Sequence, residues 1–572
     1  MKDSKISGAE ALLRSLIELG TDTVFGYPGG AILPVYDALY NCEGLRHILV
    51  RHEQGAMHSA QGYARATGRT GVVIVTSGPG ATNCITGLSD AMMDSTPLVV
   101  ITGQVGAASL GSDAFQETDV VAVTQPITKW AYQVRRAEDV PAAVARAFYI
   151  ASTGRPGPVV LDIAKDAQTG LLDYRFEPVN YIRSYDPEPP LAPETVAEAA
   201  ALINRARRPL ILAGQGVIIS GAEHELAALA ERIQAPVALT LLGLSALPSS
   251  HPLLLGMAGM HGSVAANWAT NRADLIIAIG MRFDDRVTGD TSRYAPDAHI
   301  IHIDIDRAEP GKCVKCDVAV CADAAHALRA ILAGVNRVAD RSDWLSQMGH
   351  CRRAEAEEVE TAELHRSGDM PMTMGEVAAA VSAAAPDAIA VTDVGQNQMM
   401  TARYFAFGQT RSLITSGGLG TMGFGLPAAI GAAIGRPDRT VVYFGGDGGF
   451  QMTVEELGTI MQYRVPVKMI VLNNDFLGNV RQWQTLFFGR RYSQTPLLNP
   501  DFGMLCAAYG IPSRRVESRD GLPDAIAAML AADGPYMLDI AIDPEDMVFP
   551  MTPVGKPVDY IMLSPTKLYS HD

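Results

Sequence analysis

Several classes of protein are excluded by what this sequence lacks. The chain of 572 residues has only seven cysteines, too few for a disulfide framework. It contains no run of 18 or more apolar residues, so no transmembrane helix is predicted. Its first residues lack the apolar stretch and small-residue cleavage site of a signal peptide. We therefore expect a cytoplasmic protein.

The chain has fewer positively than negatively charged residues. The chain has 46 Lys and Arg against 62 Asp and Glu, a net charge of −16 at pH 7. An acidic surface disfavours non-specific binding to nucleic acid or anionic membranes, so neither is expected as a partner. Metal-binding cysteines are also scarce. Cys313, Cys316 and Cys321 lie in one segment, but a structural zinc site usually needs four ligands, so we interpret them as simple thiols.

Short apolar segments rich in β-branched residues recur along the chain. They are continuous rather than alternating, which is typical of parallel strands buried on both faces. Most are followed by glycine and then by an alanine-rich helical stretch. This β–loop–α pattern predicts an α/β protein with several doubly wound parallel sheets. The clearest segments are 72–78, 97–103, 158–164, 209–216, 275–280, 388–395, 440–448 and 467–474.

Two segments mark expected domain boundaries. The first, around 185–200, is rich in proline, and the second, 339–372, is polar and ends at a proline. They divide the chain into expected domains at 1–185, 190–340 and 365–572, the last with a C-terminal tail. Each block has a reasonable size for a domain.

The segment from Gly445 to Asn474 carries the strongest chemical signal. Asp447 and Asn474 lie 27 residues apart, each at the end of an expected strand, where doubly wound sheets bind ligands. A carboxylate and an amide oxygen there suit Mg²⁺, which completes its shell with phosphate oxygens and water. The surrounding glycines let backbone N–H groups approach a phosphate. GDG followed by NN at this distance is typical of enzymes that use thiamin diphosphate.

Such an enzyme needs two further features. One is an isolated carboxylate that acts on the aminopyrimidine, for which Glu53 is the candidate; taken alone, it is equally well explained as a helix-start carboxylate. The other is an apolar prop that bends the cofactor. Met422, in the glycine-rich segment 417–423, has a suitable shape, although methionine is more often core filler.

Longer motifs carry a resemblance to one family. The chain resembles the catalytic large subunits of acetohydroxyacid synthase, also called acetolactate synthase, over nearly its whole length. GDG…NN and the glutamate segment are shared by all thiamin diphosphate enzymes, whereas DAFQE and RFDDRVTG are much narrower. The motifs are FGYPGGAILPVYDAL (25–39), RHEQGAMHSAQGYARATG (51–68), SGPGATN (77–83), DAFQETD (113–119), RFDDRVTG (282–289), GGLGTMGFGLPAAIGA (417–432) and GDGGF…LNN.

The resemblance implies an architecture. The expected domains would be pyrimidine-binding (1–185), central and FAD-binding (190–340), and diphosphate- and Mg²⁺-binding (365–572). A homodimer or homotetramer is expected, with thiamin diphosphate held between two chains. Glu53 and Asp447, on different domains, could then serve one cofactor.

The resemblance also assigns residues to the cofactors. Glu53 would contact the pyrimidine N1′, Met422 would be the prop, and the Gly420 carbonyl would accept from the amino group. Asp447, Asn474 and the Phe476 carbonyl would bind Mg²⁺. The other implied thiamin diphosphate contacts are Val394, Gly395, Gln396, Asn397, Gly446, Gly448, Gly449, Leu477 and Gly478. The implied positions for FAD, bound without a net redox role, are Arg155, Gly214, Gly216, Thr240, Leu241, Met260, His261, Gly280, Arg282, Val287, Asp304, Ile305, Asp323 and Ala324.

The implied reaction decarboxylates pyruvate and transfers the two-carbon unit to a second pyruvate or to 2-oxobutanoate. The products would be 2-acetolactate or 2-aceto-2-hydroxybutyrate, in branched-chain amino-acid biosynthesis. Arg286 would bind the acceptor carboxylate; its alternative is a salt bridge with Asp284 or Asp285, and the two roles are compatible. Trp483 and Met260 would contact the substrate. The remaining implied catalytic positions are Gly30, Ala31, Phe115, Gln116 and Lys165.

Some positions depart from the commonest pattern of that family. Asn397 stands where His is usual, Gly449 replaces Ser, and Asn479 replaces Met. Gly106 likewise stands where Pro is frequent in the family, and Trp130 stands where His is frequent. Asn397 can still donate to a phosphate, so cofactor binding is retained as an expectation, whereas Asn479 leaves the acceptor preference open.

Two alternatives belong to other functional classes. A pyruvate oxidase or decarboxylase using thiamin diphosphate and FAD is opposed by DAFQE and RFDDRVTG. A catalytically silent scaffold is opposed by the retained Glu53, Asp447 and Asn474. The sequence leaves open whether a small regulatory subunit binds and whether the role is biosynthetic or fermentative.

Overall fold

The computed structural model describes the chain except residues 1–4, 339, 367, 369 and 571–572. Three six-stranded sheets follow one another along the described chain, and every neighbouring pair of strands within them is parallel. The expected α/β class is confirmed, and all eight segments predicted as strands contain one. Within the described residues, no helix combines the length and apolarity needed to cross a bilayer.

The N-terminal sheet has the strand order β3-β2-β4-β5-β7-β6. Strands β4, β5 and β7 are buried along their whole length, because helices separate each pair of parallel strands and cover the sheet. The strands are β2 (Thr23–Gly26), β3 (Arg46–Leu49), β4 (Gly71–Val75), β5 (Leu98–Gln104), β6 (Trp130–Val134) and β7 (Pro158–Ala164). The main helices are α1 (Gly8–Glu18), α2 (Leu33–Tyr40), α3 (Glu53–Thr67), α4 (Pro79–Thr82), α5 (Ile85–Met93), α6 (Val120–Thr124), α7 (Val140–Ser152) and α8 (Lys165–Thr169).

The central sheet has the order β11-β10-β9-β12-β13-β14. Counted within this domain the order is 3-2-1-4-5-6, the arrangement that binds dinucleotides where the order reverses, here between β9 and β12. The strands are β9 (Pro209–Ala213), β10 (Val237–Leu239), β11 (Leu254–Met257), β12 (Leu275–Ile279), β13 (His299–Asp304) and β14 (Val318–Cys321). The helices are α9 (Pro193–Arg205), α10 (Gln215–Ser220), α11 (Glu223–Ile233), α12 (Val264–Arg272), α13 (Asp285–Thr288) and α14 (Ala324–Gly334).

The C-terminal sheet has the order β16-β15-β17-β18-β20-β19. Counted within each domain, this is the same order as in the N-terminal sheet, 2-1-3-4-6-5. The strands are β15 (Ile389–Thr392), β16 (Leu413–Ile414), β17 (Val441–Gly446), β18 (Lys468–Asn473), β19 (Ser513–Val516) and β20 (Tyr536–Ala541). The helices are α17 (Met374–Ala384), α18 (Gln396–Tyr404), α19 (Gly425–Gly435), α20 (Asp447–Met452), α21 (Leu457–Tyr463), α22 (Gly478–Phe487), α23 (Phe502–Ala508) and α24 (Leu522–Ala531).

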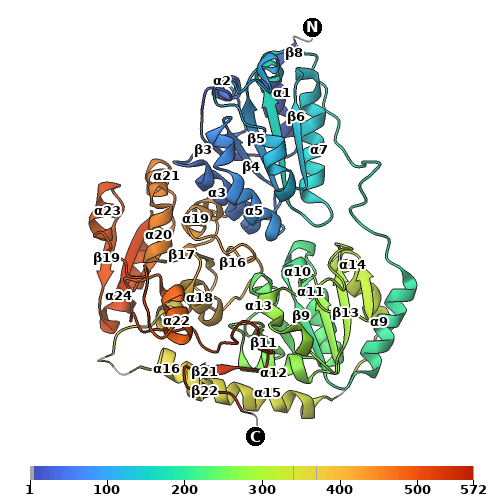
Figure 1. Cartoon of the computed structure of the whole chain (residues 1–572), viewed down its shortest axis with the longest axis vertical. Helices are drawn as coiled ribbons and strands as arrows, with labels where there is room; N and C mark the ends of the chain where they lie inside the picture. Colours follow the sequence, from blue (N-terminus) through green and yellow to red (C-terminus); the bar gives the residue numbers. More distant parts are fainter. Residues whose placement is uncertain (1–4, 339, 367, 369, 571–572) are drawn as a thin grey trace.

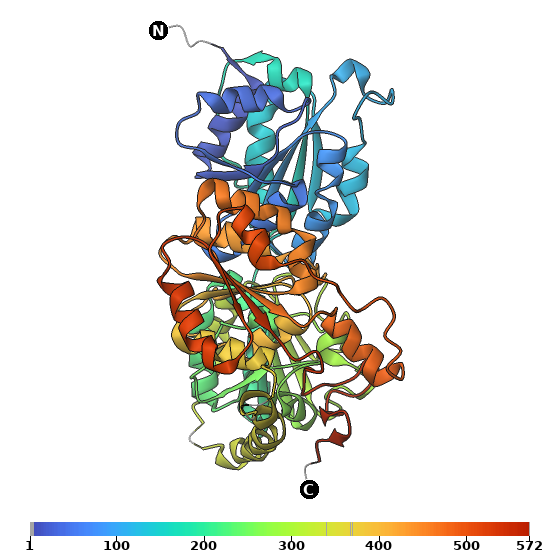
Figure 2. The ribbon, with the colours of Figure 1, turned by 90° about the vertical axis from the view of Figure 1, so that its left-hand side faces the viewer.

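The N-terminal domain occupies one end of the molecule, and the other two domains lie toward the opposite end (Figures 1 and 2). Helix α3 packs directly on α19 of the C-terminal domain. The two backbones approach so closely that a Cβ on Gly62 would lie 1.9 Å from the carbonyl oxygen of Ala428. The Ser59 hydroxyl donates to the Pro427 carbonyl across the same contact at 2.9 Å. This contact fixes the helix that begins at Glu53.

Two connecting segments cover the central domain. Helix α15 (Ser342–Glu355), continued by α16 (Thr361–Leu364), lies in the polar stretch between the central and C-terminal sheets. The C-terminal tail returns to the same region, where Met551 joins Trp344 in one apolar cluster. Its small hairpin is formed by β21 (Met562–Ser564) and β22 (Lys567–Leu568). The tail therefore packs against the central domain, although it follows the C-terminal sheet in the chain.

Candidate active site

The first group of predicted residues lies at the carboxyl edge of the C-terminal sheet. The strand order reverses between β15 and β17, and ligands bind at such points in open parallel sheets. Val394 and Gly395 follow β15, Asp447 follows β17, and Asn474 follows β18. The fold thus brings together residues from segments about 80 positions apart in the chain.

Asp447 and Asn474 are both buried. The Asp447 carboxylate accepts from the Asn499 side chain at 2.7 Å and from the Gly448 N–H at 3.0 Å. Burial nevertheless raises the pKa of Asp447 to about 6. The Asn474 amide oxygen accepts from the Phe476 N–H at 3.2 Å. A hard cation held by these oxygens would offset the cost of burying the carboxylate, so the donor set fits Mg²⁺.

No group of three or more His, Cys, Asp or Glu side chains is placed to hold a metal among the described residues. A cation at this edge would therefore depend on amide and carbonyl oxygens as well as on Asp447. That mixture of few carboxylates and several neutral oxygens leaves coordination positions for phosphate and water, as Mg²⁺ usually requires.

Met422 lies over the turn that begins helix α20. A Cβ on Gly448 would be 3.8 Å from the Met422 Cε and 2.7 Å from a Leu477 methyl group. Three predicted positions, from three separate segments, therefore meet around one small space. Gly420, two residues before the methionine, has a φ of +70°, which glycine adopts without the cost that other residues incur. An apolar methionine beside a space bordered by glycine fits the predicted support of a two-ring cofactor.

Two buried carboxylates that the sequence reasoning missed hold the loop 417–423 in place. Asp393 accepts from the Gly423 N–H at 3.0 Å. Asp94, from the N-terminal domain, accepts from the N–H groups of 417–418 at 2.8 and 2.7 Å. Burial raises the pKa of both. Nothing in the local sequence marks either residue, because their burial arises only when three segments meet.

The second group of predicted residues lies at the carboxyl edge of the N-terminal sheet. Glu53 begins α3, whose N-cap is His52, and its carboxylate accepts from the Asn83 side chain at 2.9 Å. The N–H of Ala31, next to Gly30, donates to the Thr76 hydroxyl at 3.3 Å. These contacts place three strand-end loops beside one another.

The other predicted catalytic positions border the same edge. Lys165 begins α8 directly after β7. Gln116 has a φ of +59°, and a Cβ on Gly78 would lie 2.7 Å from its carbonyl oxygen. Phe115 points into solvent, with 89% of its surface exposed. A large aromatic side chain so exposed beside a polar site is suited to contact with another chain.

We call the two sheet edges the N-terminal and the C-terminal half-site. Across the described residues, no hydrogen bond or ion pair joins Glu53 to Asp447 or Asn474, and the partner of the Glu53 carboxylate is in its own domain. The structure therefore brings together each predicted set but not the two sets with each other.

A cavity of about 1140 Å³ lies where the three domains meet. It exceeds the usual range of small-molecule pockets, about 300–1,000 Å³, so a large ligand suits it. Val394, Gly395 and Gly420 also line it, which connects it to the C-terminal half-site. The residues predicted for FAD that line it are Arg155, Gly216, Thr240, Leu241, Met260, His261, Gly280, Arg282, Val287, Asp304, Ile305, Asp323 and Ala324.

Gly214 does not line this cavity as the other FAD positions do. Its N–H donates instead to the Ile279 carbonyl at 2.9 Å, next to the reversal of strand order. Sequence reasoning also missed lining residues from the loops around the expected positions. Gln215 lies between two predicted glycines and could have been inferred from them, whereas no motif pointed to Met93, Ser95 and Leu242.

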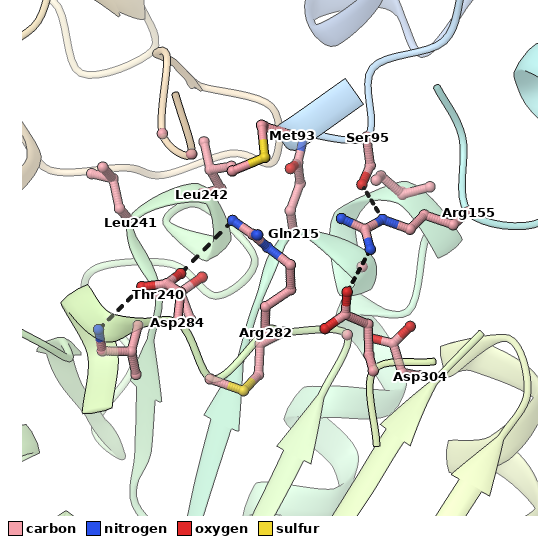
Figure 3. A pocket seen from close by; sticks show the side chains of 18 of the residues that line it. Met93, Ser95, Arg155, Gln215, Thr240, Leu241, Leu242, Arg282, Asp284 and Asp304 are labelled. Atoms are coloured by element: carbon pink, nitrogen blue, oxygen red, sulfur yellow. Dashed lines mark hydrogen bonds and ion pairs between the residues drawn. The ribbon is translucent and has the colours of Figure 1, made fainter. Parts of the chain in front are cut away.

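Charged side chains face one another across the cavity (Figure 3). The Arg155 guanidinium donates to the Ser95 hydroxyl at 2.9 Å and to Glu309 at 2.7 Å. Burial raises the pKa of Asp304, at the end of β13, to about 6. Arg282 lies 3.9 Å from Asp284. The cavity thus offers cations for phosphates and a strand-end carboxylate for a ribose.

His261 supplies a buried polar atom without a partner. Its side chain is 8% exposed, and its Nδ1 has no hydrogen bond. Burial lowers the pKa of His261 to about 4, so the ring is neutral at physiological pH. A buried polar atom without a partner costs free energy, and a ligand in the cavity could satisfy it. The cavity residues therefore fit a flavin dinucleotide.

The predicted acceptor residues lie where the cavity approaches the C-terminal half-site. Arg286 pairs with Asp285 at 2.9 Å and its side chain is 60% exposed, so it remains available to a second anion. Trp483, on α22, Met260 and Asn479 complete this part of the lining. The amide oxygen of Asn479 is buried without a hydrogen-bond partner.

Three family models match the chain in the order of its sheets. They are the N-terminal TPP binding domain (6–123), the central domain (196–331) and the C-terminal TPP binding domain (393–540) of thiamine pyrophosphate enzymes. Thiamine pyrophosphate is another name for thiamin diphosphate. The fold, the two half-sites and these matches define a thiamin diphosphate enzyme.

Curated relatives narrow the class. The chain is 46% identical to the acetolactate synthase large subunit of Lactococcus lactis, over 96% of this chain and 95% of that one. It is 45% identical to the acetolactate synthase isozyme 2 large subunit of Escherichia coli, covering 96% and 98%. A probable acetolactate synthase large subunit of Methanocaldococcus jannaschii is also 45% identical, covering 96% and 94%. The chain belongs to the acetolactate synthase large-subunit family.

Proposed function

We propose that this protein is an acetolactate synthase. Two pyruvate anions and one proton give 2-acetolactate and carbon dioxide, and with 2-oxobutanoate as acceptor the product is 2-aceto-2-hydroxybutyrate. The identity of 45% to the Escherichia coli large subunit over 96% of the chain carries this proposal. The retained carboxylates Glu53 and Asp447, each at the edge of its own sheet, support it. The expected role is branched-chain amino-acid biosynthesis.

The C-terminal half-site would hold the cofactor. Thiamin diphosphate, when bound, supplies a nucleophilic carbon and accepts the electron pair released as carbon dioxide leaves. Asp447, Asn474 and the Phe476 carbonyl would bind Mg²⁺ and so position the diphosphate. Gln396 and Asn397, both buried on α18, would contact the diphosphate, and Met422 would support the two rings.

Glu53 would exchange a proton with the pyrimidine N1′. Because one chain does not bring Glu53 to Asp447, we propose a homodimer in which each site combines the N-terminal edge of one chain with the C-terminal edge of another. Exposed apolar side chains beside the N-terminal edge support this arrangement: Phe115 is 89% exposed and Leu33 is 54% exposed. A homotetramer would be a pair of such dimers.

The central cavity would bind FAD. The dinucleotide strand order of the central sheet, the cavity of about 1140 Å³, and Arg155 and Asp304 in its lining support this ligand. Arg155 would contact phosphate and Asp304 the ribose. FAD would connect the three domains without a net change of redox state.

The acceptor would lie between the cavity and the half-site. Arg286 would bind its carboxylate, and Trp483 and Met260 would contact its alkyl group. The extra methyl group of 2-oxobutanoate is worth about 1–3 kcal/mol in an apolar pocket. Gly30, Ala31, Gln116 and Lys165 would approach from the N-terminal edge of the other chain.

The direct test supplies thiamin diphosphate, Mg²⁺, FAD and pyruvate to the purified protein. We expect acetolactate and carbon dioxide in equal amounts. Carbon dioxide with acetaldehyde alone would indicate a decarboxylase and contradict the proposal. Oxygen consumption with bleaching of the flavin would indicate a pyruvate oxidase. Competition between pyruvate and 2-oxobutanoate, with and without a candidate small subunit, would measure acceptor preference and regulation.

A further inference from the structure

A buried glutamate of the C-terminal domain contacts the loop that precedes Glu53. Glu456 ends the short 3₁₀ turn Val454–Glu456, just before α21, and its surface is fully buried. One carboxylate oxygen accepts from the N–H groups of Arg51 and His52, at 3.0 and 3.1 Å. His52 is the N-cap of α3, and Glu53 is the first residue of that helix.

The other carboxylate oxygen is held within the C-terminal domain. It accepts from the Thr459 hydroxyl at 2.6 Å. Glu456 therefore bridges α21 and the loop between β3 and α3, more than 400 positions earlier in the chain. A carboxylate that accepts two backbone N–H groups fixes the orientation of both peptide units.

The surrounding contacts leave Glu456 little freedom to move. A Cβ on Gly55, in the first turn of α3, would lie 2.1 Å from its Oε1, so the absence of a side chain there admits the carboxylate. The Arg51 side chain adds a parallel connection, because it donates to the Gly458 carbonyl at 3.1 Å and to Gln462 at 2.7 Å. The Tyr463 hydroxyl accepts from the Leu49 N–H at 2.8 Å.

We propose that Glu456 is a positioning residue for Glu53: by fixing the peptides of residues 51–52 it sets where the Glu53 carboxylate points. The inference rests on the proposed function, since the purpose of that position is proton exchange with the cofactor. In this proposal Glu456 acts through the loop and not by contact with the cofactor or substrate. A displacement of about 1 Å at a proton-transfer group can cost about 100-fold in rate.

The first measurement needs no cofactor. Hydrogen–deuterium exchange of the peptide covering residues 47–58 should speed up in Glu456→Ala, because the N–H groups of Arg51 and His52 lose their acceptor. Glu456→Gln keeps an acceptor oxygen, and its amide can donate to Thr459, so it should protect the peptide. Glu455→Ala removes the neighbouring carboxylate, which has no hydrogen bond to the loop among the described residues, and serves as the matched control.

The second measurement concerns the proton that Glu53 controls. With thiamin diphosphate and Mg²⁺ bound, exchange of the thiazolium C2 proton with D₂O should fall about 100-fold in Glu456→Ala, as it should in Glu53→Gln. The KM for pyruvate should change little, because the half-site for the cofactor is intact. Exchange in Glu456→Gln and Glu455→Ala should stay near that of the unchanged protein.

The variant Gly55→Ala tests the same contact by a change in α3 instead of a change at Glu456. Its Cβ should displace the Glu456 carboxylate and slow C2-proton exchange in a protein that keeps Glu456. In the double variant with Glu456→Ala the new methyl group meets no carboxylate, so the two effects should not add. This pair also tests the proposal if Glu456→Ala alone fails to fold.

The outcomes distinguish a failure of the positioning role of Glu456 from a failure of the proposed acetolactate synthase function. Unchanged amide exchange at residues 47–58, or unchanged C2-proton exchange in a folded Glu456→Ala, would overturn the positioning role. Additive effects of Gly55→Ala and Glu456→Ala would overturn it as well. If the unchanged protein binds no thiamin diphosphate or forms no acetolactate, the proposed function fails, while the amide exchange still reports on the contact.

Discussion

At the scale of single residues, buried carboxylates organise this protein. Asp94, Asp393 and Glu456 are fully or almost fully buried, and each accepts from two or more backbone N–H groups. An acidic side chain without a partner would be costly inside the protein, whereas one that accepts from several N–H groups fixes the backbone around it. The candidate site is therefore built on loops held by buried acidic side chains, not by apolar packing alone.

The role of Glu53 gives the simplest residue-scale prediction. Glu53→Gln keeps the size of the side chain but removes its proton exchange with the pyrimidine. We expect turnover to fall about 10²–10⁴-fold, with the dissociation constant of thiamin diphosphate nearly unchanged. Steady-state kinetics and calorimetric titration of the cofactor would measure the two quantities. An unchanged rate would remove Glu53 from its role.

Gly449 gives a second prediction at this scale. A Cβ at this position would lie 2.4 Å from the Asp393 Oδ1. Gly449→Ala should therefore displace Asp393 from the loop 417–423 and destabilise the protein by about 1–3 kcal/mol. Gly446→Ala is a matched control for stability, because its Cβ would be 3.5 Å from its nearest neighbour. Chemical denaturation of both variants would test this, and equal stabilities would contradict it.

At the scale of elements, contacts between domains hold the helix that begins at Glu53. Helix α3 is fixed along its length by α19 and at its start by the segment before α21. The sequence allows Glu53 to be a helix-start carboxylate, and α3 begins at that residue. The partners of that helix could not be predicted, because Ala428 and Glu456 lie hundreds of positions away and carry no local signal.

The ionisation of Glu456 predicts a pH dependence for this contact. Burial raises its pKa from 4.5 to about 7. Because the folded-state value lies above the unfolded one, its contribution to stability is complete below pH 4.5 and is lost as the pH rises through about 7. The groups facing it are Glu455 on its own segment and Arg51 and His52 on the loop, with the Thr459 hydroxyl.

The test compares how the free energy of unfolding depends on pH in the unchanged protein and in Glu456→Gln. From pH 4.5 to 8, the free energy of unfolding of the unchanged protein should fall relative to that of Glu456→Gln, by at most about 3 kcal/mol. Denaturant titrations at several pH values would give this difference. Parallel curves for the two proteins would mean that Glu456 does not titrate in this range.

At the scale of the whole molecule, three parallel-sheet domains of two topologies surround one cavity. The outer sheets share one strand order, whereas the central sheet has the dinucleotide order. The cavity is lined by all three domains, so a ligand there would connect them. This arrangement explains why an acidic chain can be expected to bind several anions: the cations that matter, such as Arg155 and Arg282, are local.

At this scale we predict that FAD stabilises the folded protein. A ligand that binds only the folded state at 100 times its dissociation constant adds about 2.7 kcal/mol of stability. The melting temperature should therefore rise with FAD concentration. Arg155→Ala should weaken this dependence, because it removes a cation from the cavity. Glu455→Ala, away from the cavity, should keep it. A melting temperature independent of FAD in the unchanged protein would contradict the assignment.

The α/β class, eight of the strands and the chemistry of the main motifs could be predicted from the sequence alone. Continuous apolar runs, glycine turns and GDG…NN are local patterns, and local patterns can be read in order along a chain. The folded chain was needed to establish the strand orders, the cavity, the burial of Asp393 and the contact between Glu456 and the loop before Glu53. Each of these features depends on which distant segments pack together. The contacts that stabilise this packing join residues from different segments, so no single segment contains the information.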